Sequence, residues 1–588
     1  MQKLILLLFA LLLSPSITAQ ESTPTDSTHQ ERPNIVLILV DDAALMDFGC
    51  YGGEASTPNI DRLAKGGTMF TNYHTSPMCA PSRSMLLTGY DSHLTGVPNL
   101  PLFLPPEYAA KPGYSGVLNN DVWTVATRLK KQNYRTYITG KWHLGHSESN
   151  LPSKRGFDRT YILDASGADN YEQRPYLPTQ ESKPPWYKDG QLIDLPEDFY
   201  SSRNLVDEMI QFMEETPKDD KPFFSFLSFQ AIHIPVQVPK EYTEKYIKTY
   251  EKGWGAIRQQ RYENAKKLGI IPVDAPLGDM LPVLKKWDDL SEDDKKYKAK
   301  AMAVNAGMLE AMDFHIGRYI EYLKENNQFD NTVFIITSDN GPEASSVGSV
   351  QTMKWWLKYA GYHQDYERLG ERGSFNYIGP EFASAAASPS AYFKFYAGEG
   401  GLRVPLIFSG PNIPSAQSIP AFSMVTDVTP TILSLAGAPL PAKVPAGSMT
   451  GKNLYPLIQG ETDSVYRADE AIGMEAAGQC VLYKGEMKLV RNGRPYGDGV
   501  WRLYNLTNDP GETTDLSKSS SKLFAEMTRH YSDYTDKYGV LEMGIDYQPL
   551  QEIQNKMIAQ LKVAAMPWLV GFVVLVLGIF VWRWNRKK

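Results

Sequence analysis

Short apolar runs that end abruptly in polar residues recur along this chain and constrain its fold most. Nearly continuous apolar runs are typical of strands that are buried on both faces of a sheet. Amphipathic segments with helical spacing alternate with these runs. The alternation predicts an α/β fold with a large mixed, mostly parallel sheet flanked by helices. The apolar runs lie at 35–40, 137–139, 223–229, 333–337 and 404–408, and the amphipathic segments at 122–132, 205–215, 303–326 and 431–436.

Composition excludes several classes of protein. The 588 residues include 60 Lys and Arg against 67 Asp and Glu, which gives a formal net charge of −7. This acidic balance argues against nucleic acid as a partner, because that role calls for a basic face. Apolar residues make up 42% of the chain, so a disordered protein is excluded. The three cysteines are too few for a disulfide scaffold.

Polar side chains follow the predicted strands beyond their carboxyl ends, where parallel sheets bind ligands. Asp41 and Asp42 follow the first run, and Asp339 and Asn340 follow the fourth. Four oxygen donors without a thiolate favour a hard cation, Ca²⁺ or Mg²⁺. For either pair alone, carboxylates that cap the next helix are the alternative. The same placement on two strands of one sheet favours a metal.

A second group of residues suits an anion. In Cys79-Ala80-Pro81-Ser82-Arg83 the proline is typical of a first helical turn, so we expect Cys79 at a helix N-terminus, where free N–H groups favour negative charge. The alternative is a small buried cysteine. Lys141 and His143 stand two residues apart and project from the same side of an extended segment. His233 follows another run, where a structural histidine is the alternative, and Lys394 precedes Glu399-Gly400-Gly401.

The N-terminus has the features of a targeting segment. Lys3 leads into an apolar run at 4–13, which predicts a secretory signal peptide over 1–19. A polar tether over 20–32 follows. The sequence therefore predicts an exported protein.

The C-terminus holds a second apolar run. Residues 563–582 are about as long as a helix needs to be to cross a bilayer, and a basic tail follows at 583–588. We predict a transmembrane helix there, behind a linker at 546–562. A core helix is the alternative. This arrangement places the body in the periplasm or outside the cell, anchored in a membrane such as the bacterial inner membrane.

Two domains are expected between these ends. A catalytic domain is predicted over 33–462, with insertions at 240–300 and 344–390 that could cover a cleft. A small α+β domain is predicted over 463–545, because short strand patterns and one helical pattern follow a change in composition. The strand patterns lie at 471–483, 486–491 and 500–506, and the helical pattern at 517–538.

Taken together, these motifs resemble the type I sulfatases. Cys79-Ala80-Pro81-Ser82-Arg83 matches the Cys-x-Pro-x-Arg signature of that family, in which the cysteine becomes formylglycine. Asp41-Asp42, Gly140-Lys141-Trp142-His143, His233-Ile234-Pro235 and Ser338-Asp339-Asn340-Gly341 follow in the family's order. The chain most resembles the bacterial arylsulfatases, within the alkaline phosphatase superfamily. The resemblance implies an alkaline-phosphatase-like fold and hydrolysis of sulfate esters.

The resemblance also implies roles for individual residues. One Ca²⁺ would be held by Asp41, Asp42, Asp339, Asn340 and the modified residue 79. Lys141 and Lys394 would bind the sulfate, His233 would donate a proton to the leaving alcohol, and His143 would remove one from the nucleophilic group. Arg83 would hold that group in place.

The implied partners are a formylglycine-generating enzyme and a substrate that is a small sulfate ester or a sulfated saccharide. Two other functions stay open. A phosphonate or phosphate ester hydrolase would use the same site, because the site accepts any tetrahedral oxyanion. A catalytically inactive surface protein that binds sulfated glycans would be expected to lack Cys79, a metal ligand or His143, and this chain keeps them all.

Overall fold

The computed structural model describes residues 32–108, 111–180, 182–217, 219–346, 351–440, 449–544 and 547–586. The predicted signal peptide, the tether up to residue 31 and the last two lysines lie outside these residues. Residues 33–588 form one compact unit.

One ten-stranded sheet organises this unit. Its strands occur in the order β11-β2-β10-β9-β1-β8-β4-β5-β6-β7. The five central strands from β9 to β5 are parallel, whereas β10, β6 and β7 pair antiparallel with their neighbours. The predicted mixed α/β fold is therefore confirmed. The bounds are β1 Asn34–Val40, β2 Gly67–Phe70, β4 Arg135–Lys141, β5 Arg159–Leu163, β6 Trp186–Lys188, β7 Gln191–Ile193, β8 Phe223–Ser228, β9 Thr332–Ser338, β10 Leu406–Ser409 and β11 Gln417–Ile419.

Strand β1 shows why the predicted strands are apolar throughout. All seven of its residues are buried, and it lies between β8 and β9. Side chains alternate between the two faces of a strand. Val36, Ile38 and Val40 pack into one hydrophobic core, and Ile35 and Leu37 pack into the core on the opposite face. A strand with a core on each side has no position where a polar residue would meet water.

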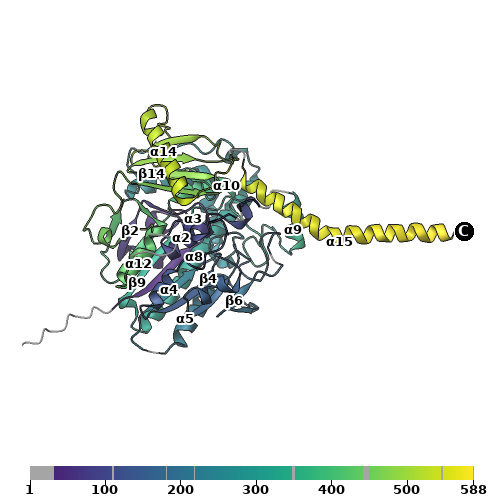
Figure 1. Ribbon diagram of the computed structural model, residues 1–588, viewed down its shortest axis with the longest axis horizontal. Coiled ribbons are helices and arrows are strands. Elements are labelled where there is room, and N and C mark those ends of the chain that lie inside the picture. Colours follow the sequence, from purple (N-terminus) through teal and green to yellow (C-terminus); the bar gives the residue numbers. More distant parts are fainter. Residues whose placement is uncertain are drawn as a thin grey trace, which may run out of the picture. The chain divides into compact units, whose positions relative to one another are not determined.

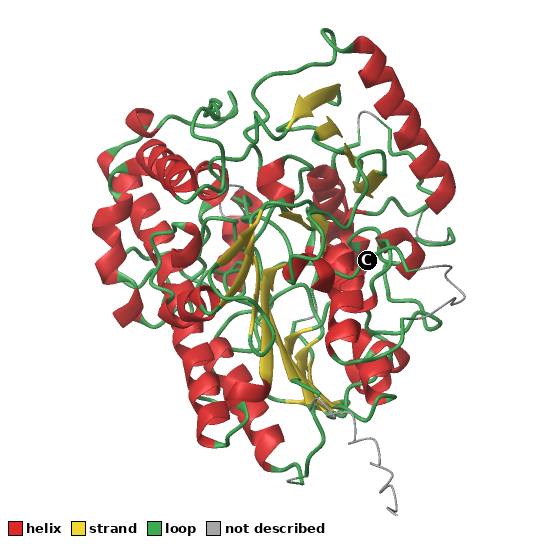
Figure 2. Cartoon of the chain, turned by 90° about the vertical axis from the view of Figure 1, so that its left-hand side faces the viewer, coloured by secondary structure: helices red, strands yellow, loops and turns green. Residues whose placement is uncertain are grey.

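Helices cover both faces of the sheet, as Figure 2 shows. Helices α5 and α8 contribute to the core that contains Val36. Helices α2, α4 and α12 contribute to the core that contains Ile35. The helix bounds are α1 Pro58–Lys65, α2 Cys79–Thr88, α3 Ser92–Thr95, α4 Val125–Lys130, α5 Ser201–Glu214, α6 Ile247–Tyr250, α7 Gly253–Lys267, α8 Glu292–Glu325, α9 Gln351–Tyr359, α10 Gly379–Ala386, α11 Glu399–Leu402, α12 Val428–Leu435 and α13 Tyr455–Ile458.

A small antiparallel sheet and one long helix follow in the C-terminal part. The four strands pair in sequence order, and α14 packs its Met527, Tyr531 and Tyr534 into their apolar core. These elements agree with the strand and helix patterns expected after the change in composition. Their bounds are β13 Ala471–Ala476, β14 Gln479–Lys484, β15 Met487–Arg491, β16 Trp501–Asn505 and α14 Ser521–Tyr538. A minor two-stranded sheet joins β3 Tyr73–His74 to β12 Ser423–Met424.

The prediction of a membrane span at 563–582 is wrong. Within the described part of the chain, no helix meets the length and hydropathy that a bilayer crossing requires. The apolar run is instead the second half of a single helix, α15 Pro549–Asn585, drawn in yellow in Figure 1. That helix begins among polar residues, is tied to the protein body through Lys556, and contains Pro567. The predicted membrane anchor is therefore withdrawn. That prediction depended only on the apolar composition of residues 563–582.

Candidate active site

The ends of β1 and β9 bring the four predicted oxygen donors together. Val40 and Ser338 are paired in register, so Asp41-Asp42 and Asp339-Asn340 leave the sheet side by side. Asp42 has a left-handed backbone conformation with φ of 71°. Its N–H donates to Oδ1 of Asp339 at 3.2 Å, and Nδ2 of Asn340 donates to Oδ1 of Asp42 at 2.6 Å. All four side chains are buried.

Cys79 is the first residue of α2, as its sequence context predicts. Its Sγ lies 3.4 Å from Nδ1 of His143. It also forms a possible metal-binding group with Asp41 and Asp339, whose ligand atoms all lie within 4.8 Å of one another. Burial raises the pKa of the thiol and outweighs the opposing charges of Lys141 and Lys394. The unmodified thiol is therefore held in its neutral form.

Arg83 lies one turn further along α2 and connects three elements. Its Nε and Nη2 lie 2.9 and 2.8 Å from Oδ2 of Asp339. Its Nη1 donates to the carbonyl oxygen of Lys141 at 3.0 Å and to Oγ of Ser228 at 2.6 Å. The guanidinium thus fixes the ends of β4, β8 and β9 relative to the helix that carries Cys79.

Two lysines pair with the carboxylates that directly follow β1. Nζ of Lys141 lies 2.6 Å from Oδ2 of Asp41, and Nζ of Lys394 lies 2.8 Å from Oδ1 of Asp42. Lys394 also pairs with Glu343 at 2.8 Å. Sequence reasoning missed Glu343, although a charged residue just after the Asp339-Asn340 motif was a usable signal.

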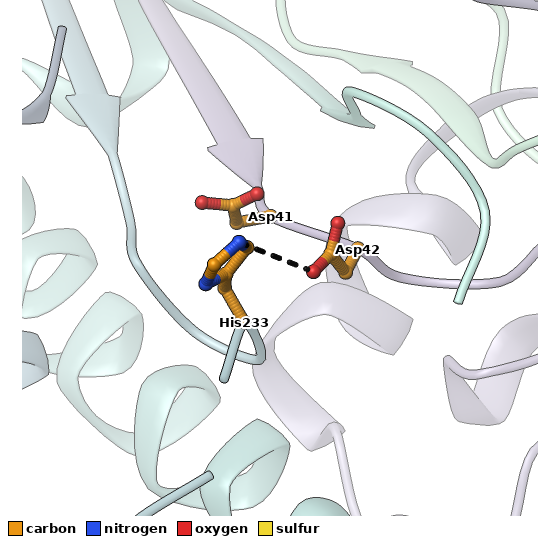
Figure 3. A group of neighbouring side chains, drawn as sticks. All are labelled: Asp41, Asp42 and His233. Carbon is orange, nitrogen blue, oxygen red and sulfur yellow. Dashed lines mark ion pairs between the residues drawn. The ribbon is translucent and has the colours of Figure 1, made fainter. Parts of the chain in front are cut away.

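The two histidines face this cluster from separate loops. Figure 3 shows His233 beside Asp41 and Asp42, with Nε2 lying 3.9 Å from Oδ2 of Asp42. Nδ1 of His233 lies 2.6 Å from the carbonyl oxygen of Ile234, so that nitrogen carries the hydrogen and Nε2 is the atom that faces the cluster. Burial, followed by the charge of a lysine, lowers the pKa of both His143 and His233.

The residues fit a hard cation. Oδ1 of Asp41 and Oδ1 of Asn340 are buried without a hydrogen-bond partner among the residues that the structure describes. Buried polar atoms are normally satisfied. Burial and the neighbouring Asp339 raise the pKa of Asp41 to about 6. Carboxylates held this close repel one another, and oxygen donors of this kind suit Ca²⁺.

The structure thus gathers every predicted site residue around one point. A cavity of about 820 Å³ reaches this point, and Cys79, His143, His233 and Lys394 line it. The remaining lining is largely apolar and aromatic. A cavity with charged residues at the site and an apolar wall elsewhere suits an ester that joins an oxyanion to an apolar alcohol.

The comparisons with known proteins agree with this arrangement. Residues 33–438 match the model of the Sulfatase family. An arylsulfatase of Klebsiella aerogenes is 35% identical over 74% of this chain and 91% of its own length. An uncharacterized sulfatase of Schizosaccharomyces pombe is 34% identical over 88% of this chain and 96% of its own length. The chain belongs to the type I sulfatase family and is a sulfuric ester hydrolase.

Solved structures show the same fold. The structure named Ps i-CgsB, in complex with k-i-k-neocarrahexaose, has a TM-score of 0.61 and 25% identity. The match covers 88% of this chain and 94% of the Ps i-CgsB chain. A protein named BT4656, solved with its substrate D-glucosamine-2-N,6-O-disulfate, has a TM-score of 0.55 at 20% identity, over 86% of this chain and 98% of the BT4656 chain.

Proposed function

We propose that this sulfatase acts through a formylglycine made from Cys79 and through one Ca²⁺ held by Asp41, Asp42, Asp339 and Asn340. The observation that carries the proposal is the position of Cys79, grouped with the two carboxylates of Asp41 and Asp339 and 3.4 Å from Nδ1 of His143. When present, the modified residue and the cation supply a hydrated aldehyde that attacks sulfur and a positive charge that neutralises the sulfate oxygens.

The chain's own residues then bind the anion and move protons. Lys394 lines the cavity beside Cys79, and Nζ of Lys141 lies next to Asp41, so we expect both ammonium groups to bind sulfate oxygens. His143 is neutral because of burial and the nearby Lys141, so it accepts a proton at Nδ1. Arg83 holds α2 against Asp339 and keeps residue 79 oriented.

His233 is the proposed proton donor to the leaving alcohol. Its Nδ1 hydrogen is engaged by the carbonyl oxygen of Ile234, so Nε2 is the nitrogen that serves the reaction. A bound sulfate ester adds negative charge beside the imidazole, and such a charge favours the protonated form. Protonation of the departing oxygen avoids the release of an alkoxide.

The relatives support two kinds of alcohol. An arylsulfatase points to phenols, and the structure solved with k-i-k-neocarrahexaose points to saccharides. A formylglycine-generating enzyme is the required partner during maturation.

Mass spectrometry of the Cys79 peptide, together with turnover of an aryl sulfate, tests the proposal. We expect a mass that corresponds to the aldehyde or its hydrate, and loss of turnover in Cys79→Ser. An unmodified thiol in fully active protein would contradict the formylglycine part. Faster turnover of an aryl phosphonate in the same preparation would favour the phosphonate hydrolase.

A further inference from the structure

The wall of the substrate cavity includes part of helix α15. Met557 and Ile558 line the cavity that also reaches Cys79. Helix α9, within the predicted insertion at 344–390, contributes Met353 and Trp356. Segments far apart in the sequence therefore share one wall, and three of these four side chains are aliphatic.

Lys556 ties this part of α15 to the body. Its Nζ donates to three carbonyl oxygens around the short 3-10 helix at 101–103, those of Pro101, Leu102 and Leu104, at 3.0, 3.1 and 2.6 Å. Three hydrogen bonds to one ammonium fix the rotation of the helix at this point. The residues that follow Lys556 are thereby held against the cavity.

The rest of the wall is mostly aliphatic and aromatic, with fewer polar side chains. Phe103, Tyr176 and Phe395 supply ring surface. Some of the polar side chains in the lining are engaged within the protein: Nε2 of Gln180 donates to Oγ of Ser166 and to the carbonyl oxygen of Gly167. Glu343 is paired with Lys394. Apolar surface removed from water in such a cavity favours binding, whereas unmatched hydroxyl groups oppose it.

We propose that α15, held by Lys556, is a specificity wall that selects sulfate esters of large apolar or aromatic alcohols. The inference rests on the proposed sulfatase reaction and adds the class of alcohol that it releases. The sulfate lies among the charged groups near Cys79, and the alcohol extends along Trp356, Met557 and Ile558.

Two aryl sulfates test this wall in the full-length enzyme. Phenyl sulfate and biphenyl-4-yl sulfate release phenols of similar acidity, so they differ mainly in apolar size. We expect kcat/KM to be roughly tenfold higher for the biphenyl ester, as apolar pockets typically discriminate. Ile558→Ser and Lys556→Met should each reduce this ratio to about two- or threefold while leaving turnover of phenyl sulfate nearly unchanged.

Ile579→Ser is the matched control. Ile579 lies in the same helix and is 48% exposed, against 49% for Ile558, but it does not line the cavity. This variant should keep the wild-type ratio. Equal kcat/KM for the two esters in the wild type, or an unchanged ratio in both wall variants, would overturn the inference while the sulfatase function stood. Failure to hydrolyse either ester would overturn the proposed function itself.

Discussion

Nη2 of Arg83 lies 2.8 Å from Oδ2 of Asp339, and both side chains are almost fully buried. Although burial tends to raise the pKa of Asp339, the charges of Arg83 and Lys141 hold it below its usual range. A buried pair of this kind is costly to break, because the remaining partner keeps its charge away from water.

Arg83→Met should therefore impair both stability and turnover. We expect a loss of about 3 kcal/mol in the free energy of unfolding, typical of a broken buried ion pair, measured by chemical denaturation. Turnover of an aryl sulfate should fall at least a hundredfold. Arg261→Met is the control, since Arg261 is equally buried with Asp47 and Glu54 but lies outside the site. A similar loss of turnover in the control would show that the effect is only structural.

Calcium should stabilise the folded protein through Asn340. A ligand that binds only the folded state at a hundredfold excess over Kd adds about 2.7 kcal/mol. We expect the melting temperature to rise with Ca²⁺, to fall with a chelator, and to respond much less in Asn340→Ala. Asn376→Ala is the control, because Asn376 is buried with an unpartnered Oδ1 in the described residues but lies apart from the carboxylates. An unaltered calcium response in Asn340→Ala would argue against the assigned ligand.

His93 should make stability fall at alkaline pH. Burial tends to lower its pKa, but hydrogen bonds with Asp91 and Glu475 outweigh burial and raise the pKa to about 9. Because the folded pKa exceeds the unfolded value of 6.5, the stabilisation is complete below pH 6.5 and is lost as pH rises through 9. It amounts to something on the order of 3 kcal/mol.

Denaturation curves between pH 6 and 10 measure this effect. His93→Gln should flatten the decline, because Glu475 belongs to β13 and the charged histidine attaches that strand to the body. His530→Gln, on the more exposed face of α14, should leave the decline intact. An equally steep decline in His93→Gln would rule out the histidine as its source.

Glu343 should position Lys394 during sulfate binding. Glu343→Gln keeps the size of the side chain but removes its charge, so Lys394 should pair more closely with Asp42. We expect KM for an aryl sulfate to rise by about tenfold with a smaller change in kcat. Glu381→Gln, a buried carboxylate of α10, provides the comparison. A large fall in kcat at unchanged KM would assign Glu343 a different role.

Much of the fold and site was accessible from the sequence because the signals are local. The apolar runs predicted β1, β8 and β9. Asp41-Asp42 and Asp339-Asn340 directly follow β1 and β9, and Cys79 starts α2. Glu343 was not predicted because its ion pair is with Lys394, which lies 51 residues further along the chain. The apolar segment at 563–582 was misjudged because its hydropathy was read without the polar half of α15, whose Lys556 contacts the body.

Alternate side chains of strand β1 pack into two different cores, and Asp41-Asp42 directly follow the strand. A one-residue slip in its pairing would exchange the side chains of the two cores and carry both carboxylates away from Asp339 and Arg83. An incorrectly registered chain therefore cannot assemble the proposed cation site. Calcium would therefore stabilise only those molecules in which β1 has paired in the correct register.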